Sequence, residues 1–179
     1  ARQAGFTNIR GVDMSPQMVA AARRLDIDGI EEGDAIGALE SLDPESHEAV
    51  ISFDVLEHLK RDEMIQLIDE VRRVLKPGGR WIIHTVNAEA PFFGRVRFGD
   101  LTHEQAFTQA SLRQILLASD FSSIACYEDA PIPGRPAAML RWLMWKIVRL
   151  PALFWLIAES GPAARHAILS QNLLAVAIK

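Results

Sequence analysis

Acidic residues and a histidine follow an apolar run near the middle of the chain. Residues 49–53 read Ala-Val-Ile-Ser-Phe, and Asp54, Glu57 and His58 come directly after them. An apolar run that ends abruptly in polar residues is typical of a buried parallel strand with functional groups at its carboxyl end. Carboxylates and an imidazole placed there could transfer a proton or hold a divalent cation.

Two more carboxylates follow shorter apolar segments nearer the start of the chain. Asp13 ends a predicted strand over 8–13 and is followed by Met14, and Asp34 comes after a weaker predicted strand over 29–32. A carboxylate at a strand end can accept hydrogen bonds from both hydroxyls of a ribose. Taken singly, Asp13 could simply end a strand and Asp34 could be an ordinary turn residue.

Strand and helix signals alternate through the first 130 residues, which predicts an α/β fold with a doubly wound, mostly parallel sheet. Ser15 and Pro16 are a helix start, with Met18, Val19, Ala22 and Leu25 expected on its apolar face. A second helix is predicted over 64–75, with Gly78 as its stop, and a third runs from the cap Thr108 to residue 118. Further strands are predicted over 49–53, 81–85, 122–127 and 171–178.

The order Asp13, Asp34, Phe53-Asp54 and Lys76-Pro77-Gly78-Gly79 resembles that of class I S-adenosylmethionine-dependent methyltransferases. The resemblance implies S-adenosylmethionine as cofactor. By analogy with the family, Asp13 would bind the ribose hydroxyls and Met14 would pack on the adenine ring. Asp34, with Ala35, would contact the adenine amino group, and Phe53 and Asp54 would contact the methionine part.

The same resemblance implies a Rossmann-like sheet of strand order 3-2-1-4-5-7-6 with an antiparallel final strand. Nothing upstream of Asp13 matches the family's first strand and glycine-rich loop, and residues 1–6 look like the end of the helix that follows that loop. We therefore expect the C-terminal part of a longer enzyme, which alone would bind cofactor poorly. The predicted parts are an incomplete core over 1–130, a helical lid or insertion over 131–170, and the final core strand over 171–179.

Two histidines are the predicted catalytic residues. His58 lies one turn beyond a strand end, and His103 lies between carboxylates in a loop over 87–104, where related enzymes close over the acceptor. Either imidazole could remove a proton from a hydroxyl, since histidine titrates near neutral pH. His84, within a strand, is expected to be a core residue. The run that contains Asp54, Glu57 and His58 also resembles one in ubiquinone-type O-methyltransferases, to which a divalent metal has been assigned. The alternative is that Glu57 and His58 only cap and orient a helix start.

Residues 137–158 are apolar, contain three of the four tryptophans, and carry Arg141, Lys146 and Arg149. These cations and Pro151 argue against a membrane span. A cationic face bordered by tryptophan is typical of an interfacial membrane helix, so peripheral membrane contact is one prediction. The other is a lid that packs on the sheet and shapes the acceptor pocket.

The predicted function is therefore methyl transfer from S-adenosylmethionine to a small or lipid-linked acceptor, such as the oxygen of a sugar or a quinone-like phenol. Residues 1–130 hold 22 acids against 13 lysines and arginines, the wrong sign for nucleic acid. The lone Cys126 fits a reducing compartment, the cytoplasm. The competing hypothesis is a non-catalytic, membrane-associated partner protein with the same fold. A Rossmann dehydrogenase fits the run from Asp54 to His58 less well.

Overall fold

The computed structural model describes residues 5–179, in which strands and helices alternate up to the last third of the chain. The strands are β1 (Gly11–Asp13), β2 (Ile30–Glu32), β3 (His47–Phe53), β4 (Leu75–Val86), β5 (Ser123–Glu128) and β6 (Asn172–Ile178). The helices are α1 (Pro16–Arg24), α2 (Ala35–Glu40), α3 (Arg61–Val74), α4 (Phe93–Arg97), α5 (Gln109–Ala118) and α6 (Pro136–Ser160), with 3₁₀ turns η2 (Leu56–His58) and η3 (Pro162–His166).

The strands form two sheets. β1 and β2 pair in parallel, and a four-stranded sheet has the order β3-β4-β6-β5, with β6 antiparallel to both neighbours. These orders agree with the two halves of the predicted 3-2-1-4-5-7-6 sheet on either side of its central strand. The predicted helix end over residues 1–6 falls mostly on residues 1–4, outside the described residues, and Gly5 and Phe6 are not helical.

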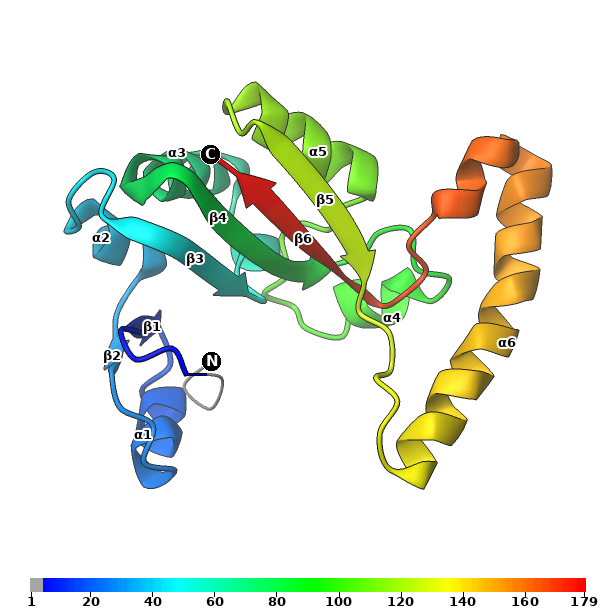
Figure 1. Cartoon of the computed structure of the whole chain (residues 1–179), viewed down its shortest axis with the longest axis horizontal. Coiled ribbons are helices and arrows are strands. Elements are labelled where there is room, and N and C mark those ends of the chain that lie inside the picture. Colours follow the sequence, from blue (N-terminus) through cyan, green and yellow to red (C-terminus); the bar gives the residue numbers. More distant parts are fainter. Residues whose placement is uncertain (1–4) are drawn as a thin grey trace.

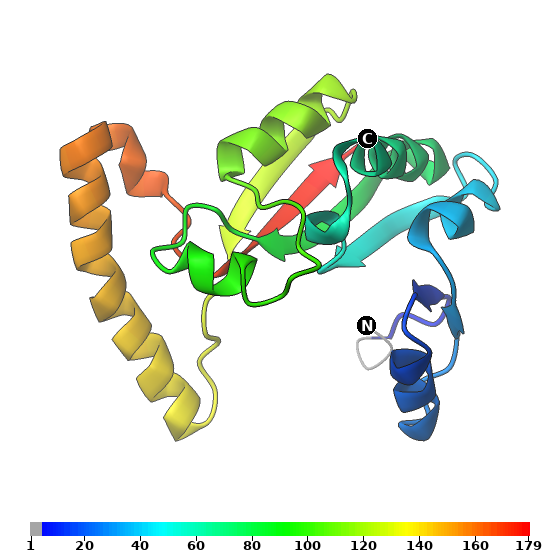
Figure 2. The ribbon, with the colours of Figure 1, turned by 180° about the vertical axis from the view of Figure 1, so that it is seen from behind.

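Helices α3 and α5 cover one face of the four-stranded sheet, as the view from behind shows (Figure 2). Alternate residues of the strands point into this layer, as the period of two in a strand requires. The core there contains Trp81, Ile83, Ala175 and Ala177 from the sheet and a set of helix residues: Leu67, Ile68, Val71, Leu112 and Leu116. This well-packed layer of helices therefore fixes the sheet, and with it the carboxyl ends of the strands.

The helix α3 ends earlier than the sequence predicts. Val74 is its last residue, and the chain enters β4 at Leu75, so that Pro77 and Gly78 lie inside a long strand rather than in a helix-ending turn. Gly78 has φ of 75°, a conformation that glycine adopts at little cost, and a Cβ on Gly79 would lie 2.8 Å from the Lys76 carbonyl oxygen. The two glycines thus let the chain bend at the start of the strand.

The helix α1 starts as predicted, with the Ser15 hydroxyl accepting a hydrogen bond from the Met18 amide. Its expected apolar face is only partly buried: Val19 is buried, but Met18 and Leu25 are exposed. The reason is that α1 packs against a sheet of two strands, which is too narrow to cover a whole helix face.

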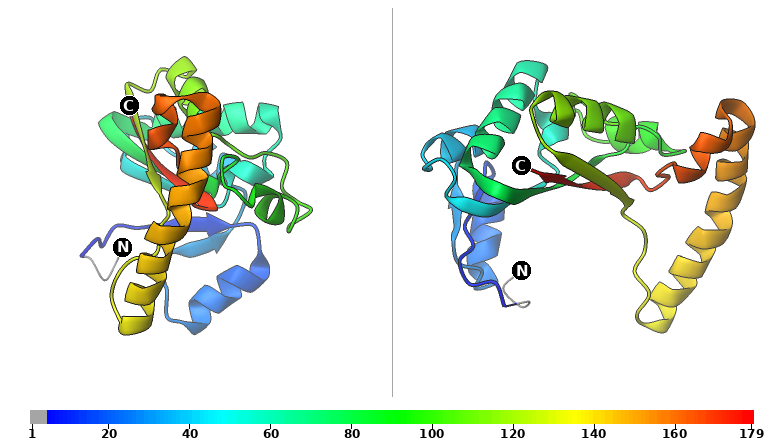
Figure 3. Two further views of the ribbon diagram at one scale, coloured as in Figure 1. Left: turned by 90° about the vertical axis from the view of Figure 1, so that its right-hand side faces the viewer. Right: turned by 45° about the horizontal axis from the view of Figure 1, so that its top comes forward.

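The helix α6 stands apart from the sheet, connected by residues 129–135 on one side and by η3 on the other (Figures 1 and 3). None of its residues is buried. Within residues 5–179, no helix has the length and apolar character needed to cross a bilayer.

The segment that returns from α6 to β6 is fixed to the sheet by one buried side chain, Asn87. Its Nδ2 donates to the carbonyl oxygens of Ile168 and Ser170, both at 2.7 Å, and its Oδ1 accepts from the Glu89 amide at 3.0 Å. Because Asn87 is fully buried, water cannot replace these hydrogen bonds.

We predict that Asn87→Ala lowers the free energy of unfolding by about 2–4 kcal/mol, since it leaves two buried carbonyl groups and one amide unpaired. Urea denaturation followed by circular dichroism measures this. Gln171→Ala, which removes an exposed amide close by, should change the value by less than about 0.5 kcal/mol. Equal effects of the two variants would contradict the assignment of Asn87 as the anchor.

Candidate functional site

The structure places Asp13 at the carboxyl end of β1, where the sequence predicts a ribose-binding carboxylate. Its Oδ1 accepts a hydrogen bond of 2.8 Å from the Ser15 amide, which fixes the carboxylate beside the start of α1. Its Oδ2 has no hydrogen-bond partner among residues 5–179. Met14, beside it, is 75% exposed. A fixed carboxylate with one free oxygen, next to an exposed apolar side chain, fits a ribose and an adenine ring.

Asp34 caps α2. Its Oδ2 accepts a hydrogen bond of 2.8 Å from the Gly37 amide, and Ala35 is the first residue of the helix. Asp34 therefore has the ordinary structural role that the sequence also allows, that of a turn residue before a helix. Oδ1 of the exposed carboxylate is left for a ligand, so the cap does not prevent the predicted contact with an adenine amino group.

The carboxyl end of β3 is joined to β4 through His84. The Phe53 ring stacks on the His84 ring with centroids 4.0 Å apart, and the Asp54 Oδ1 lies 2.5 Å from His84 Nδ1. On the other side, His84 Nε2 lies 3.4 Å from an Asp129 carboxylate oxygen. His84 is thus a buried residue with both nitrogens partnered, as expected. Phe53 is 64% exposed and presents its free ring face at the strand end.

Glu57 is a buried acid, 1% exposed, in the turn η2 that follows β3. Its Oε2 accepts a hydrogen bond of 2.9 Å from the Thr85 hydroxyl on β4. Burial raises the pKa of this carboxyl, since a charged group is poorly solvated in the core; hydrogen bonds from its own backbone and from Thr85 act in the opposite direction.

The main-chain carbonyl of Glu57 holds the loop that contains His103. It accepts hydrogen bonds from the amides of Glu104, at 2.7 Å, and Gln105, at 2.9 Å. The result is that His103 lies against His58, with ring centroids 4.7 Å apart and an edge-to-face arrangement. The two predicted catalytic histidines therefore lie next to each other, and the main-chain hydrogen bonds of Glu57 hold the second one in place.

A short relay of hydrogen bonds orients His58. The Thr102 hydroxyl donates to Asp100 Oδ1 at 2.7 Å, and His58 Nδ1 lies 2.9 Å from the same hydroxyl oxygen. Hydrogen bonds from the Thr102 side chain and amide lower the pKa of Asp100, so this carboxylate acts only as an acceptor. Since the hydroxyl has one proton and gives it to Asp100, His58 Nδ1 must donate to Thr102. In the neutral ring, Nε2 then carries the free lone pair.

The same histidines form a potential cation site with Glu57. One ligand atom from each of Glu57, His58 and His103 lies within 4.8 Å of the others, and His103 Nδ1 is buried without a hydrogen-bond partner in the described part of the chain. Asp54, the third predicted metal candidate, faces His84 instead. Carboxylate and imidazole donors in this arrangement could hold a divalent cation.

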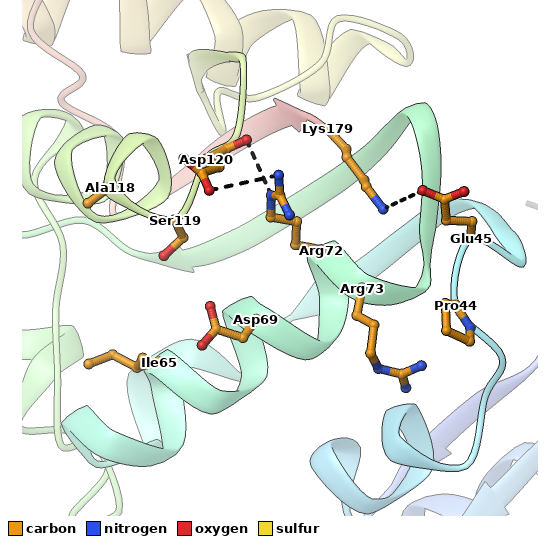
Figure 4. A pocket seen from close by; sticks show the side chains of 10 residues that line it. All are labelled: Pro44, Glu45, Ile65, Asp69, Arg72, Arg73, Ala118, Ser119, Asp120 and Lys179. Carbon is orange, nitrogen blue, oxygen red and sulfur yellow. Dashed lines mark hydrogen bonds and ion pairs between the residues drawn. The ribbon is translucent and has the colours of Figure 1, made fainter.

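A separate pocket lies at the opposite end of the strands, where β3 and β4 begin and β6 ends (Figure 4). Four of its charged residues form two ion pairs: Arg72 with Asp120 at 3.9 Å, and Lys179 with Glu45 at 3.5 Å. One ion pair joins α3 to the end of α5, and the other joins the segment before β3 to the residue that follows β6. We assign them a structural role.

Residues 1–83 match the family model of a methyltransferase domain. This segment contains β1 to most of β4, with Asp13, Asp34, Phe53 and Asp54. This match and the fold together support a class I S-adenosylmethionine-dependent methyltransferase domain. The family and its fold imply S-adenosylmethionine as the cofactor. The search among curated proteins finds no match.

Solved structures of methyltransferases have the same fold. One from Archaeoglobus fulgidus is 13% identical with a TM-score of 0.61, over 99% of this chain and 90% of that one. One from Mesorhizobium loti is 19% identical with a TM-score of 0.62, over 99% and 83%. A Thermotoga maritima protein described as a possible histamine N-methyltransferase is 15% identical with a TM-score of 0.62, over 96% and 73%. At such identities, the likeness concerns the fold alone.

Sequence reasoning missed Thr85, Thr102 and Asp129 as partners of the site. A threonine in a strand or a loop has no pattern that marks it as a hydrogen-bond partner. The one available signal for Thr102 is its place between Asp100 and His103, in a loop already singled out for its charge.

We predict that Glu57→Gln changes the pH dependence of stability. A raised carboxyl pKa contributes stability that is present below the unfolded value of 4.5 and is lost as pH rises through the folded pKa. Glutamine keeps an acceptor for Thr85 and cannot ionise. The variant should therefore gain in unfolding free energy relative to the wild type as pH rises from about 4 to 7. Urea denaturation in the presence of a chelator measures this; a constant difference would contradict it.

Proposed function

We propose that the protein transfers a methyl group from S-adenosylmethionine to a hydroxyl oxygen of a small or lipid-linked acceptor, such as a sugar or a quinone-like phenol. The observation that carries the proposal is the orientation of His58, whose Nε2 lone pair is set by Thr102 and Asp100. Hydroxyl acceptors lose a proton during methyl transfer, and a fixed imidazole is suited to take it. Nitrogen and carbon acceptors that are already nucleophilic need no such base.

The cofactor would be held by the strand-end residues, with Asp13 on the ribose, Met14 on the adenine ring and Asp34 with Ala35 at its amino edge. Phe53 and Asp54 would contact the methionine part. When bound, the cofactor supplies a methyl group on a sulfonium for in-line displacement. The protein's own contribution is to hold the acceptor oxygen in line with that group, which lowers the entropic part of the barrier.

His58 would accept the hydroxyl proton at Nε2, and the positive charge that develops on its ring is stabilised through Thr102 by the Asp100 carboxylate. His103 would contact the acceptor from the loop that the Glu57 carbonyl holds in place. Thr102 and Asp100 are positioning residues, since they act through His58.

The competing hypothesis, a non-catalytic protein with the same fold, gives no role to the Asp100–Thr102–His58 relay. The acid excess of residues 1–130 supports a partner other than nucleic acid, and the free Cys126 supports a place in the cytoplasm.

The cofactor contacts predict that Asp13→Ala weakens binding of S-adenosylhomocysteine by about 10- to 100-fold, because a charge-assisted hydrogen bond to the ribose is lost. Isothermal titration calorimetry on protein expressed from its own reading frame, with any residues encoded before Ala1, measures this. Asp62→Ala, at an exposed position in the first turn of α3, is the matched control and should leave the affinity unchanged. Equal binding by Asp13→Ala would refute the assignment.

The relay predicts a graded loss of turnover. Initial rates are measured with radiolabelled S-adenosylmethionine and a panel of catechols, sugars and lipid extract. His58→Gln should lower kcat by about 10²- to 10⁴-fold without changing the KM for S-adenosylmethionine. Thr102→Ala should lower it by about 10-fold, and Thr102→Ser should restore it, because serine keeps the hydroxyl.

The same assay separates an imidazole base from a metal site. If His58 acts as a base, EDTA should leave the rate unchanged. A rate abolished by EDTA and restored by Mg²⁺ or Zn²⁺ would assign Glu57, His58 and His103 to a metal instead. Cofactor binding without methylation of any acceptor by a folded protein would favour the non-catalytic hypothesis.

A further inference from the structure

The side of α6 that faces away from the rest of the molecule is apolar and exposed along its length. Large apolar residues recur at intervals of three and four: Leu140, Leu143, Ile147, Leu150 and Phe154. We call these five residues the outer stripe. Their side chains are between 49 and 74% exposed, which is unusual for a row of consecutive apolar positions on one helix face.

The opposite side of α6 is the one attached to the protein. Arg149 forms an ion pair of 3.2 Å with Glu128 at the end of β5, and both side chains are mostly buried. Trp142 and Trp145, on the same side, are half-buried. The helix is therefore held with a fixed side inward, and the outer stripe has no cover among residues 5–179.

We propose that the outer stripe docks on the surface of a bilayer that contains anionic lipids. Lys146 is exposed directly beside the stripe. On the other side, the exposed apolar residues Met144 and Val148 lie between the stripe and the exposed Arg141, and Arg135 is exposed at the start of the helix. Residues 131–179 hold six lysines and arginines and a single acid, Glu159. An apolar face bordered by cations complements a membrane surface, where acyl chains lie below negatively charged headgroups.

The charges favour a bilayer over a second copy of the chain. Two copies that packed stripe against stripe would each bring Lys146 to the edge of the same seam, and Glu159 is the only acid of this helix available to pair with it. Like charges in a closed seam repel one another. Anionic headgroups supply the opposite charge on both sides of the stripe at once.

The helix fits a position parallel to the membrane plane. Its 25 residues extend for about 37 Å. The Lys146 ammonium lies over the Trp142 ring at 5.6 Å, and Trp155 is exposed beside Phe154, so that an amphipathic ring borders the apolar row. Tryptophan prefers the headgroup level of a bilayer. Docking here would bring the loop over residues 87–104, which contains His103 and which we call the acceptor loop, close to lipid-linked molecules. The docking itself does not depend on methyl transfer.

Vesicle flotation tests the proposal on the full chain. We expect binding to vesicles of phosphatidylcholine with phosphatidylglycerol, little binding to phosphatidylcholine alone, and release at high salt. Replacing the stripe residues in the double variant Ile147→Glu with Phe154→Glu should lower the partition coefficient by more than about 10-fold. Arg141→Ala with Lys146→Ala should lower it by roughly 30-fold, since each cation near the surface adds about one factor of five.

The matched control is Leu25→Glu with Leu117→Glu, which adds the same two charges at exposed apolar positions of α1 and α5. It should bind as the wild type does, and circular dichroism checks that every variant is folded. Absence of binding by the wild type, or equal binding by the stripe variant and the wild type, would overturn the proposal. So would a dimer in light scattering that the stripe variant alone dissociates, because the stripe would then belong to a second copy.

Discussion

The candidate site depends on one buried residue, Glu57. Its carboxyl reaches Thr85 on β4, and its main-chain carbonyl accepts the amides of Glu104 and Gln105, 47 and 48 residues further along the chain. A buried carboxyl is costly to ionise, as its raised pKa indicates, and the cost is tolerated because the residue closes three segments into one unit. Together with the hydrogen bond between Thr102 and His58, these contacts fix the loop that contains His103 relative to His58.

The sequence was sufficient to predict the strands and the longer helices, because their signals are local, but it did not predict the short helices α2 and α4. The strands β3, β5 and β6, the cap at Ser15 and the helix starting after Thr108 follow from apolar periodicity and from capping residues. The end of α3 was predicted wrongly at Gly78. Proline and glycine there suggest a turn, but Leu75 pairs with His47 of β3, and Gly78 and Gly79 form main-chain hydrogen bonds with Lys179, so that β4 begins before them. Tertiary contacts decided this boundary.

The arrangement of the site could be predicted only in part, because its contacts join residues far apart in the chain. That His58 and His103 lie at the end of the sheet follows from strand order and from the resemblance. Which nitrogen of His58 carries the lone pair depends on Thr102, 44 residues away, and on its bond to Asp100. Such a relay has no repeating pattern. The pairing of Asp54 with His84, rather than with Glu57 and His58, depends likewise on strand register.

The exposed helix and the acceptor loop have common attachment points, which links the two proposals physically. The Glu128 carboxylate accepts both the Arg149 guanidinium of α6 and, at 3.1 Å, the amide of Leu169. The segment over 168–170 is in turn held by Asn87, the residue from which the acceptor loop departs. Helix α6 is therefore connected to the start of that loop through two polar side chains, the half-buried Glu128 and the buried Asn87. Docking of the outer stripe on a bilayer would, through these contacts, also set the position of that loop relative to the membrane surface.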